Sequence, residues 1–152
     1  MKAVIQRVSH ASVVVDGETV GSCERGYLIL LGVKEGDCET DAELLCRKIA
    51  NLRIFRDEND KMNLSVKDID GEALVISQFT LMANYRHGNR PDFLESAKPE
   101  EAKRLYEYFT ALLQKELRRV ECGIFGADMK VTLLNDGPVT ICMDSEVLKK
   151  KK

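Results

Sequence analysis

The sequence predicts a single α+β domain with a mostly antiparallel, barrel-like β-sheet and two main helices. Its 152 residues are enough for one hydrophobic core. Six or seven short apolar runs have the composition of strands, and those near the N-terminus lie too close together for helical crossovers. Only two segments show helical periodicity. We expect residues 1–145 to form this domain and residues 146–152 to form a basic C-terminal tail.

The first 33 residues have the pattern of consecutive strands. Apolar runs cover residues 4–8, 11–15, 19–23 and 27–33, and turn signals such as Asp16-Gly17 separate them. This spacing is typical of a β-meander. The last of these runs is apolar on both strand faces, which predicts a central strand covered on both sides.

Two helices are expected after this strand region. Thr40 and Glu43 have the spacing of a capping box, and apolar residues then recur at helical spacing as far as Leu52. A second, longer helix should begin at Pro99, because proline suits the first helical position. Its apolar stripe continues to Leu113.

The segments that follow the predicted buried strands contain most of the unusual residues. A strand at residues 73–76 leads directly into Ser77-Gln78-Phe79-Thr80-Leu81. Near the C-terminus, runs at 130–134 and 139–143 flank Asn135-Asp136-Gly137-Pro138. Asp-Gly between strands is a hairpin signal, and a proline fits the first residue of the next strand. Local chemistry alone therefore favours a plain turn over a binding device there.

Composition excludes several classes of protein. A formal net charge of −2 argues against a protein that coats nucleic acid. The five cysteines form no Cys-x-x-Cys pair, so neither a zinc site nor a disulfide framework is indicated, and reduced thiols fit the cytoplasm. No apolar run approaches the roughly 20 residues of a membrane span. We therefore expect a soluble cytoplasmic protein without membrane contact.

The sequence offers no self-contained catalytic set. Ser77 and Thr80 could present hydroxyls at a strand end, but the only histidines are His10 and His87, and no Gly-x-Ser-x-Gly elbow is present. Metal-ligand spacing and phosphate-binding glycine loops are also missing. We expect no metal and no cofactor, and an enzyme that depends on backbone groups or on its substrate.

Two motifs resemble the signatures of the D-aminoacyl-tRNA deacylases, also called D-tyrosyl-tRNA deacylases. They are Ser77-Gln78-Phe79-Thr80-Leu81 and Asn135-Asp136-Gly137-Pro138-Val139-Thr140. Further segments resemble the family in the same order, including Gln6-Arg7-Val8, Gly88-Asn89-Arg90-Pro91 and Phe125-Gly126-Ala127-Asp128-Met129. The resemblance extends from Met1 to about Met143, and the C-terminal lysines lie outside it.

The resemblance implies an editing hydrolase. The family cleaves the ester between a D-amino acid, or glycine, and the 3′ ribose of tRNA. Its Gly-Pro bond is cis, and this corner enters the active site of the other subunit of a homodimer. Carried over, Gly137 and Pro138 would hold the substrate's α-ammonium on main-chain carbonyls and exclude an L side chain. Arg7 and Asn135 would support the corner, with an exposed arginine in a surface ion pair as the alternative for Arg7.

The resemblance also implies roles for the first motif. Backbone N–H groups of Phe79 and Thr80 would stabilise the negative charge that ester hydrolysis builds on the carbonyl oxygen. Gln78 would position the adenosine or the carbonyl, and Ser77 would help to bind the substrate. The family relies on the 2′-OH of the substrate to activate water, so we place Thr80 as a positioning residue ahead of a nucleophile.

Two alternatives remain open from the sequence. The chain could be a non-catalytic module that binds the acylated 3′ end of tRNA, or a structural dimer whose Gly-Pro segment only connects strands. For the deacylase, RNA binding should be local, with Arg86, His87, Asn89, Arg90 and the tail lysines as backbone contacts and an ordinary solvated loop as the alternative.

Overall fold

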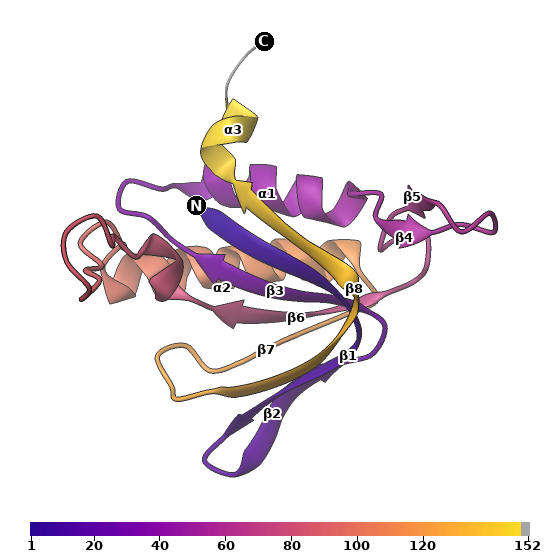
Figure 1. Cartoon of the computed structure of the whole chain (residues 1–152), viewed down its shortest axis with the longest axis horizontal. Coiled ribbons are helices and arrows are strands. Elements are labelled where there is room, and N and C mark those ends of the chain that lie inside the picture. Colours follow the sequence, from indigo (N-terminus) through magenta and orange to yellow (C-terminus); the bar gives the residue numbers. More distant parts are fainter. Residues whose placement is uncertain (150–152) are drawn as a thin grey trace.

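The computed structural model describes residues 1–149 and contains one main sheet with two helices packed against it (Figure 1). Its strands are β1 (Lys2–Val15), β2 (Glu18–Cys23), β3 (Gly26–Gly32), β6 (Glu72–Ser77), β7 (Arg119–Cys122) and β8 (Lys130–Asp144). The main helices are α1 (Glu39–Asn51) and α2 (Pro99–Glu116). A small separate sheet pairs β4 (Phe55–Arg56) with β5 (Met62–Leu64). The predicted α+β class, barrel-like sheet and two main helices are confirmed.

Strand β1 is the centre of the sheet because it pairs with three other strands. Its first half, residues 2–8, is antiparallel to β3, and its second half, residues 11–15, is antiparallel to β2. Strand β8 follows the other edge of both halves. The predicted meander is therefore wrong, because β2 and β3 both pair with β1 instead of with each other among the described residues. One long strand replaces the two short strands expected from the sequence.

The two main helices connect parallel strands. Helix α1 lies between β3 and β6 in the chain, α2 lies between β6 and β7, and both strand pairs are parallel. Each helix thus returns the chain to the end of the sheet where the previous strand began. The apolar faces of the helices, including Leu45, Ile49, Leu105 and Phe109, are fully buried against the sheet.

Helix α1 begins earlier than predicted. Its N-cap is Cys38, and the Asp41 carboxylate accepts a hydrogen bond of 2.9 Å from the Cys38 N–H. The expected capping box of Thr40 and Glu43 is therefore wrong. An aspartate three residues after the cap can accept from the cap's N–H as a glutamate does. The second helix begins at Pro99, as predicted.

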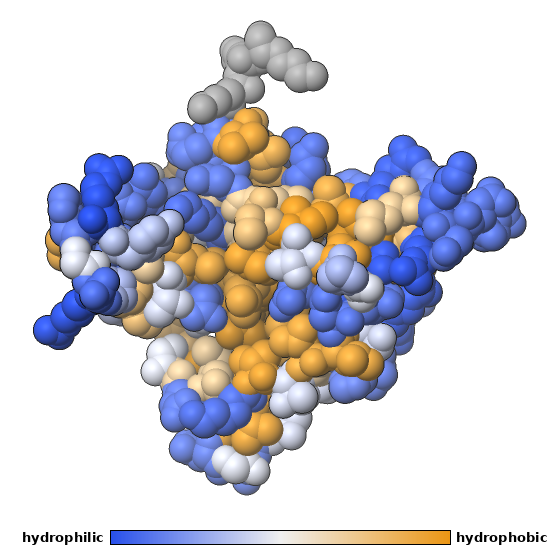
Figure 2. Space-filling view, viewed as in Figure 1, coloured by the Kyte–Doolittle hydropathy of each residue, from blue (hydrophilic) through white to orange (hydrophobic). Residues whose placement is uncertain are grey.

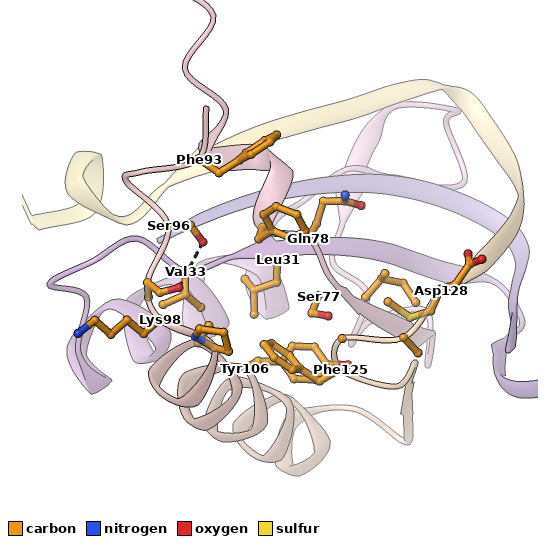
Figure 3. Close-up of a pocket in the computed structure, with 18 of the residues that line it drawn as sticks. Leu31, Val33, Ser77, Gln78, Phe93, Ser96, Lys98, Tyr106, Phe125 and Asp128 are labelled. Atoms are coloured by element: carbon orange, nitrogen blue, oxygen red, sulfur yellow. Dashed lines mark hydrogen bonds between the residues drawn. The ribbon is translucent and has the colours of Figure 1, made fainter. Parts of the chain in front are cut away.

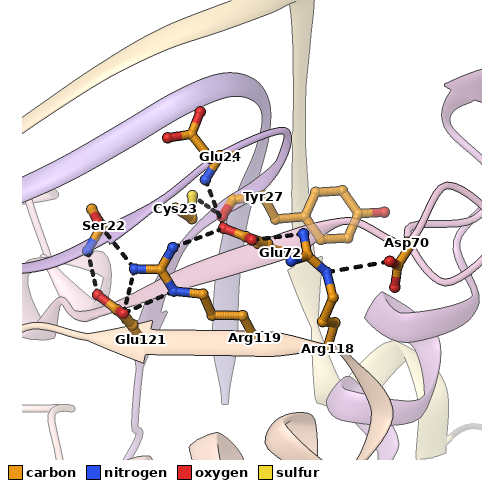
Figure 4. A network of polar contacts seen from close by, with 9 residues as sticks. All are labelled: Ser22, Cys23, Glu24, Tyr27, Asp70, Glu72, Arg118, Arg119 and Glu121. Atoms are coloured by element: carbon orange, nitrogen blue, oxygen red, sulfur yellow. Dashed lines mark hydrogen bonds and ion pairs between the residues drawn. The ribbon is translucent and has the colours of Figure 1, made fainter.

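The sheet curls until β2 approaches β7, which nearly closes a barrel. The Ser22 N–H donates to the Glu121 carboxylate at 2.8 Å, and Arg119 donates to the Ser22 hydroxyl (Figure 4). A Cβ added to Gly21 would lie 2.6 Å from the Cys122 carbonyl oxygen, so glycine permits this close approach. Buried apolar side chains from four strands fill the interior, among them Val8, Val13, Leu28, Leu74 and Ile76.

The hairpin predicted at the Gly-Pro segment is wrong, because this segment lies inside strand β8. Gln6 pairs with Thr140 and Val8 pairs with Asn135, so residues 136–139 of β8 stand opposite the single β1 residue Arg7. The segment is a wide bulge in one continuous strand, and the chain continues in its original direction. An Asp-Gly pair cannot reverse the chain when both flanking segments bond to the same partner strand.

Helix α3 (Ser145–Lys149) spans the predicted boundary between domain and tail. The Ser145 N–H donates to the Met1 carbonyl, and the Lys149 ammonium lies 2.8 Å from the Asp41 carboxylate. Residues 150–152 of the predicted tail lie outside the described residues, so the division at residue 145 stays a prediction. Within residues 1–149, no helix combines the length and apolar character needed to cross a membrane.

Candidate active site

A cavity of about 700 Å³ opens beside the end of β6 (Figure 3). Ser77, Gln78 and Phe79 of the first motif line it. The remaining walls come from the end of β3, from α2 and the segment before it, and from residues 125–131, which lead into β8. Most of the lining is apolar, with a few polar groups, and a cavity of this size and kind suits a small organic group.

The first motif forms a tight turn where β6 ends. The 3₁₀ helix η1 (Phe79–Met82) begins immediately after Gln78, whose own N–H donates to the Leu31 carbonyl at 2.8 Å. The N–H groups of Phe79 and Thr80 occupy the first turn of η1, where a helix leaves its donors without internal partners. They are thus positioned as a pair of donors at the strand end.

Thr80 lies beside the cavity and does not line it. Its side chain is exposed, and its hydroxyl accepts a hydrogen bond from the Gln78 side-chain amide. This bond fixes the half-buried Gln78 side chain at the cavity wall. Gln78 and Thr80 belong to one motif in the sequence, and the structure adds the direct contact between their side chains.

Aromatic residues to which the sequence assigned no role form two walls of the cavity. In Figure 3, Ser77 lies between Gln78 and the rings of Tyr106 and Phe125, while Phe93 stands beyond Gln78. The Phe93 and Phe79 rings meet edge to face, with centroids 5.1 Å apart. Tyr106 belongs to the apolar face of α2, where periodicity indicates only burial. Phe125 lies in a segment that resembles the family, but the sequence does not show that it lines the cavity.

The cavity has no histidine in its described lining. His10 and His87 are both exposed and stand outside it. Burial raises the pKa of Tyr106, and its hydroxyl donates to the Val75 carbonyl at 3.0 Å, so it stays neutral. Among residues 1–149, no group of three or more His, Cys, Asp or Glu side chains could hold a metal ion. Besides Tyr106, the polar side chains of the described lining are the Ser77 and Ser96 hydroxyls, the Gln78 amide, the Lys98 ammonium and the Asp128 carboxylate.

The second motif forms an exposed corner on β8. Gly137 and Pro138 are exposed, and the bond between them is cis. Asn135 closes the base of the bulge, because its side-chain amide donates to the carbonyls of Arg7 at 3.0 Å and Val139 at 2.9 Å. A Cβ at position 137 would lie 2.1 Å from the Val139 nitrogen, so only glycine fits there.

Arg7 holds the corner from below. Its side chain is 1 % exposed, and its Nε donates to the Asp136 carbonyl at 2.8 Å. Its Nη1 donates to the Ile54 carbonyl at 2.7 Å, which connects the corner to the segment before β4. Arg7 is therefore not the exposed arginine of the alternative, although its Nε also lies 3.4 Å from the Asp136 carboxylate as an ion pair. Arg7 and Asn135 thus make the corner a fixed feature instead of a mobile loop.

The two motifs do not meet within one chain. None of the corner residues from Asn135 to Pro138 lines the cavity that contains Ser77, Gln78 and Phe79. The corner instead faces outward from β8, which pairs only with β1 among the described strands. Each motif is well formed, and the two stand apart in this chain.

The chain matches a family model described as D-Tyr-tRNA(Tyr) deacylase over residues 4–144. It is 60 % identical to a D-aminoacyl-tRNA deacylase of Ruegeria pomeroyi over 95 % of this chain and 99 % of that protein. It is 54 % identical to a D-aminoacyl-tRNA deacylase of Caldicellulosiruptor bescii over 96 % of this chain and 98 % of that protein.

Two solved structures share the fold. One, named c-Myc DNA Unwinding Element Binding Protein, has a TM-score of 0.90 and 44 % identity over 95 % of this chain and 98 % of its own. The other, a probable eukaryotic D-amino acid tRNA deacylase, has a TM-score of 0.81 at 14 % identity, over 93 % of this chain and 97 % of its own. In both comparisons nearly all of this chain and of the matched chain is covered, which agrees with the family match. The chain therefore belongs to the D-aminoacyl-tRNA deacylase family, and it is a hydrolase that cleaves D-aminoacyl-tRNA.

Proposed function

We propose that this deacylase selects its substrate by chirality, with the corner of residues 135–138 as the filter. The observation that supports this proposal most strongly is that the corner is exposed and yet rigidly held by Arg7 and Asn135. A fixed backbone can reject one enantiomer by steric clash without any contact to the side chain of the other. A flexible loop would move aside.

In this proposal the carbonyls of Gly137 and Pro138 bind the α-ammonium of the aminoacyl group. An L side chain would then point into the corner, while a D side chain would point away from it. Since the filter does not contact the D side chain, many D-aminoacyl-tRNAs should be substrates. Glycyl-tRNA should also be cleaved, because glycine has no side chain to exclude.

We propose that two copies of the chain complete the site as a homodimer. The corner lies away from the cavity of its own chain, so a second copy has to supply the corner that faces each cavity. Within residues 1–149, strand β8 pairs along one edge only, and apolar side chains gather on this face of the molecule (Figure 2). Leu134 on β8 is 52 % exposed. A symmetric dimer would cover this surface and bring both motifs together twice.

The cavity would hold the terminal adenosine, with Ser77 and Gln78 as its polar contacts. Water attacks the ester carbonyl, and the N–H groups of Phe79 and Thr80 stabilise the oxyanion that forms. The carbon–oxygen bond to the ribose 3′ oxygen then breaks. That oxygen takes up a proton, and the D-amino acid and tRNA are released. The 2′-OH of the substrate would activate the water, which fits a cavity without a histidine in its described lining.

We place this activity in the cytoplasm, as proofreading of charged tRNA before translation. All five cysteines are free thiols in the structure, which fits a reducing compartment. Hydrolysis there would return mischarged tRNA to use.

The experiment is a deacylation assay of the purified protein with D-Tyr-tRNA, L-Tyr-tRNA and Gly-tRNA at equal concentration. The proposal expects release of D-tyrosine and glycine, with L-Tyr-tRNA intact. Release of D- and L-tyrosine at similar rates would contradict the chiral filter and leave the hydrolase activity in place.

A further inference from the structure

The segment that joins η1 to α2 forms a closed loop, seen at the left of Figure 1. We call residues 84–94 the aromatic-basic loop. Asn84 and Asp92 exchange backbone hydrogen bonds of 2.8 and 3.0 Å, which fixes the base of the loop. The Arg86 N–H donates to the Asn84 side chain at 3.0 Å, so the first residues of the tip are also held. The loop is therefore an ordered projection from the domain.

The tip presents one aromatic ring and two unpaired guanidinium groups. Tyr85 is 82 % exposed, an unusual state for a large aromatic side chain. Arg86 and Arg90 are exposed, and neither forms an ion pair among the described residues. By contrast, Arg104 and Arg119 each bond to carboxylates. Two exposed guanidinium groups without an ion pair favour an anionic partner such as the backbone of a nucleic acid.

The loop also leads away from the cavity. Phe93 lines the cavity and packs against Phe79, and it directly follows Asp92 at the base of the loop. A second hollow of about 430 Å³ lies between Tyr85, Arg86 and Glu95. A chain that leaves the cavity past Phe93 therefore meets an aromatic ring, a guanidinium group and a space beside them.

We propose that the aromatic-basic loop binds the unpaired RNA nucleotides that precede the terminal adenosine. This inference rests on the proposed function, because it requires that adenosine occupies the cavity. Tyr85 stacks on a base, and the hollow beside it accommodates that nucleotide. Arg86 and Arg90 bind the neighbouring phosphates. Stacking on aromatic rings together with basic side chains along the backbone is how proteins hold single-stranded RNA without sequence preference.

The test compares a long and a short substrate. The specificity constant kcat/KM is measured on two substrates, D-Tyr-tRNA and the D-tyrosyl ester of adenosine. The proteins compared are wild type, Tyr85→Ala and the double variant Arg86→Gln/Arg90→Gln. On the tRNA we expect both variants to lose about tenfold or more, which for Tyr85→Ala is the usual effect of removing one stacked base. On the adenosine ester all three should be equal. The logarithm of kcat/KM falls linearly with the logarithm of the salt concentration. The double variant should make this slope shallower by about 1.4, or about 0.7 for each lost phosphate contact.

Matched variants separate these contacts from general effects. Tyr85→Phe keeps the ring and should restore the rate on tRNA. Arg47→Gln removes an exposed arginine on α1 that has no ion pair among the described residues, and it should behave as wild type. Equal losses on both substrates would overturn the proposal, as would loop variants that match Arg47→Gln on tRNA. A change in sedimentation of the loop variants would show that a second copy covers the loop, which also overturns it.

Failure of the proposed function gives a different result. In that case wild type would not cleave D-Tyr-tRNA selectively, and the loop is then tested by binding. Uncharged tRNA is compared with tRNA trimmed of its unpaired 3′ nucleotides. Weaker binding of Tyr85→Ala to intact tRNA only would support the loop contact, while equal binding of wild type and Tyr85→Ala to both would refute it.

Discussion

The Arg7 guanidinium donates to the Asp136 main-chain carbonyl across 2.8 Å, so a buried side chain on β1 determines the position of an exposed corner on β8. Its second bond, to the Ile54 carbonyl, prevents the arginine from following the corner if the corner moves. The other terminal nitrogen of Arg7 is buried without a hydrogen-bond partner. A buried charge is thus retained at a position where it orients the segment that we propose as the filter.

Arg7→Lys should weaken both stability and chiral selection. A lysine cannot reach both carbonyls from one head group, and a buried carbonyl without a partner costs about 1–3 kcal/mol. We expect the ratio of kcat/KM for D-Tyr-tRNA over L-Tyr-tRNA to fall by about tenfold, equivalent to about 1.4 kcal/mol of discrimination. Arg56→Lys, at an exposed ion pair with Asp60, is the control and should keep the ratio. An unchanged ratio in Arg7→Lys would remove Arg7 from substrate selection.

Gly137→Ala should disable the corner, because the new Cβ would overlap the Val139 nitrogen at 2.1 Å. Mixing it with Gln78→Ala tests whether the site is shared between subunits. A mixed dimer contains one site with both motifs intact, so equal amounts with subunit exchange should recover about a quarter of wild-type activity. Gly17→Asn is the control substitution, since Gly17 has a φ of +79° in an open turn and asparagine tolerates that conformation. No recovery on mixing, with exchange verified, would place both motifs in one chain's site.

Thr80→Ala should retain most deacylase turnover. The proposed oxyanion contact uses the Thr80 backbone N–H, which alanine keeps, and the hydroxyl only accepts a bond from Gln78. We expect a moderate rise in KM with a smaller change in kcat, as the Gln78 amide loses its partner. Full loss of kcat in Thr80→Ala, with recovery in Thr80→Ser and normal folding of both, would instead identify the hydroxyl as a nucleophile.

Glu72→Ala should destabilise the barrel by about 2–4 kcal/mol. Glu72 is 3 % exposed and accepts from the Glu24 N–H at 2.8 Å, from Arg118 at 2.7 Å and from Arg119 at 3.4 Å (Figure 4). Its loss leaves these donors without their acceptor where β6 meets β7. The measurement is the free energy of unfolding in urea. Glu116→Ala, which removes an exposed ion pair with Lys67, should change it little, and an equally small effect at Glu72 would refute the assigned role.

Asp41 should make stability fall in acid. Burial raises the pKa of its carboxyl, but hydrogen bonds from Lys149, Ser145 and the Cys38 N–H outweigh this and hold the pKa below its usual value. The unfolded chain has a pKa of about 3.9 for this group, so the stabilisation is complete above that value and is lost as pH falls toward the folded-state pKa. Asp41→Asn should therefore be less stable than wild type at pH 7, with the difference in unfolding free energy smaller at pH 3. Asp60→Asn, at an exposed ion pair, is the control and should match wild type at both pH values. If the difference in unfolding free energy between Asp41→Asn and wild type were larger at pH 3 than at pH 7, the role assigned to Asp41 would be wrong.

The sequence by itself determined the fold class and the family. Helical periodicity depends on neighbouring residues, so the apolar stripe of α2 and its start at Pro99 could be predicted from local pattern. Each of the two motifs lies within six consecutive residues, so the sequence alone was enough to reveal the resemblance.

Only the tertiary structure decided how β1 shares its edge between β2 and β3, because strand pairing depends on partners distant in the chain. The same holds for the Gly-Pro corner. Local turn chemistry predicted a hairpin, but pairing of both flanking segments with β1 makes the corner a bulge beside Arg7. The cavity walls Phe93, Tyr106 and Phe125 come from three separate segments that only folding brings together. Local interactions therefore select the elements, while long-range pairing and packing determine which residues share a site.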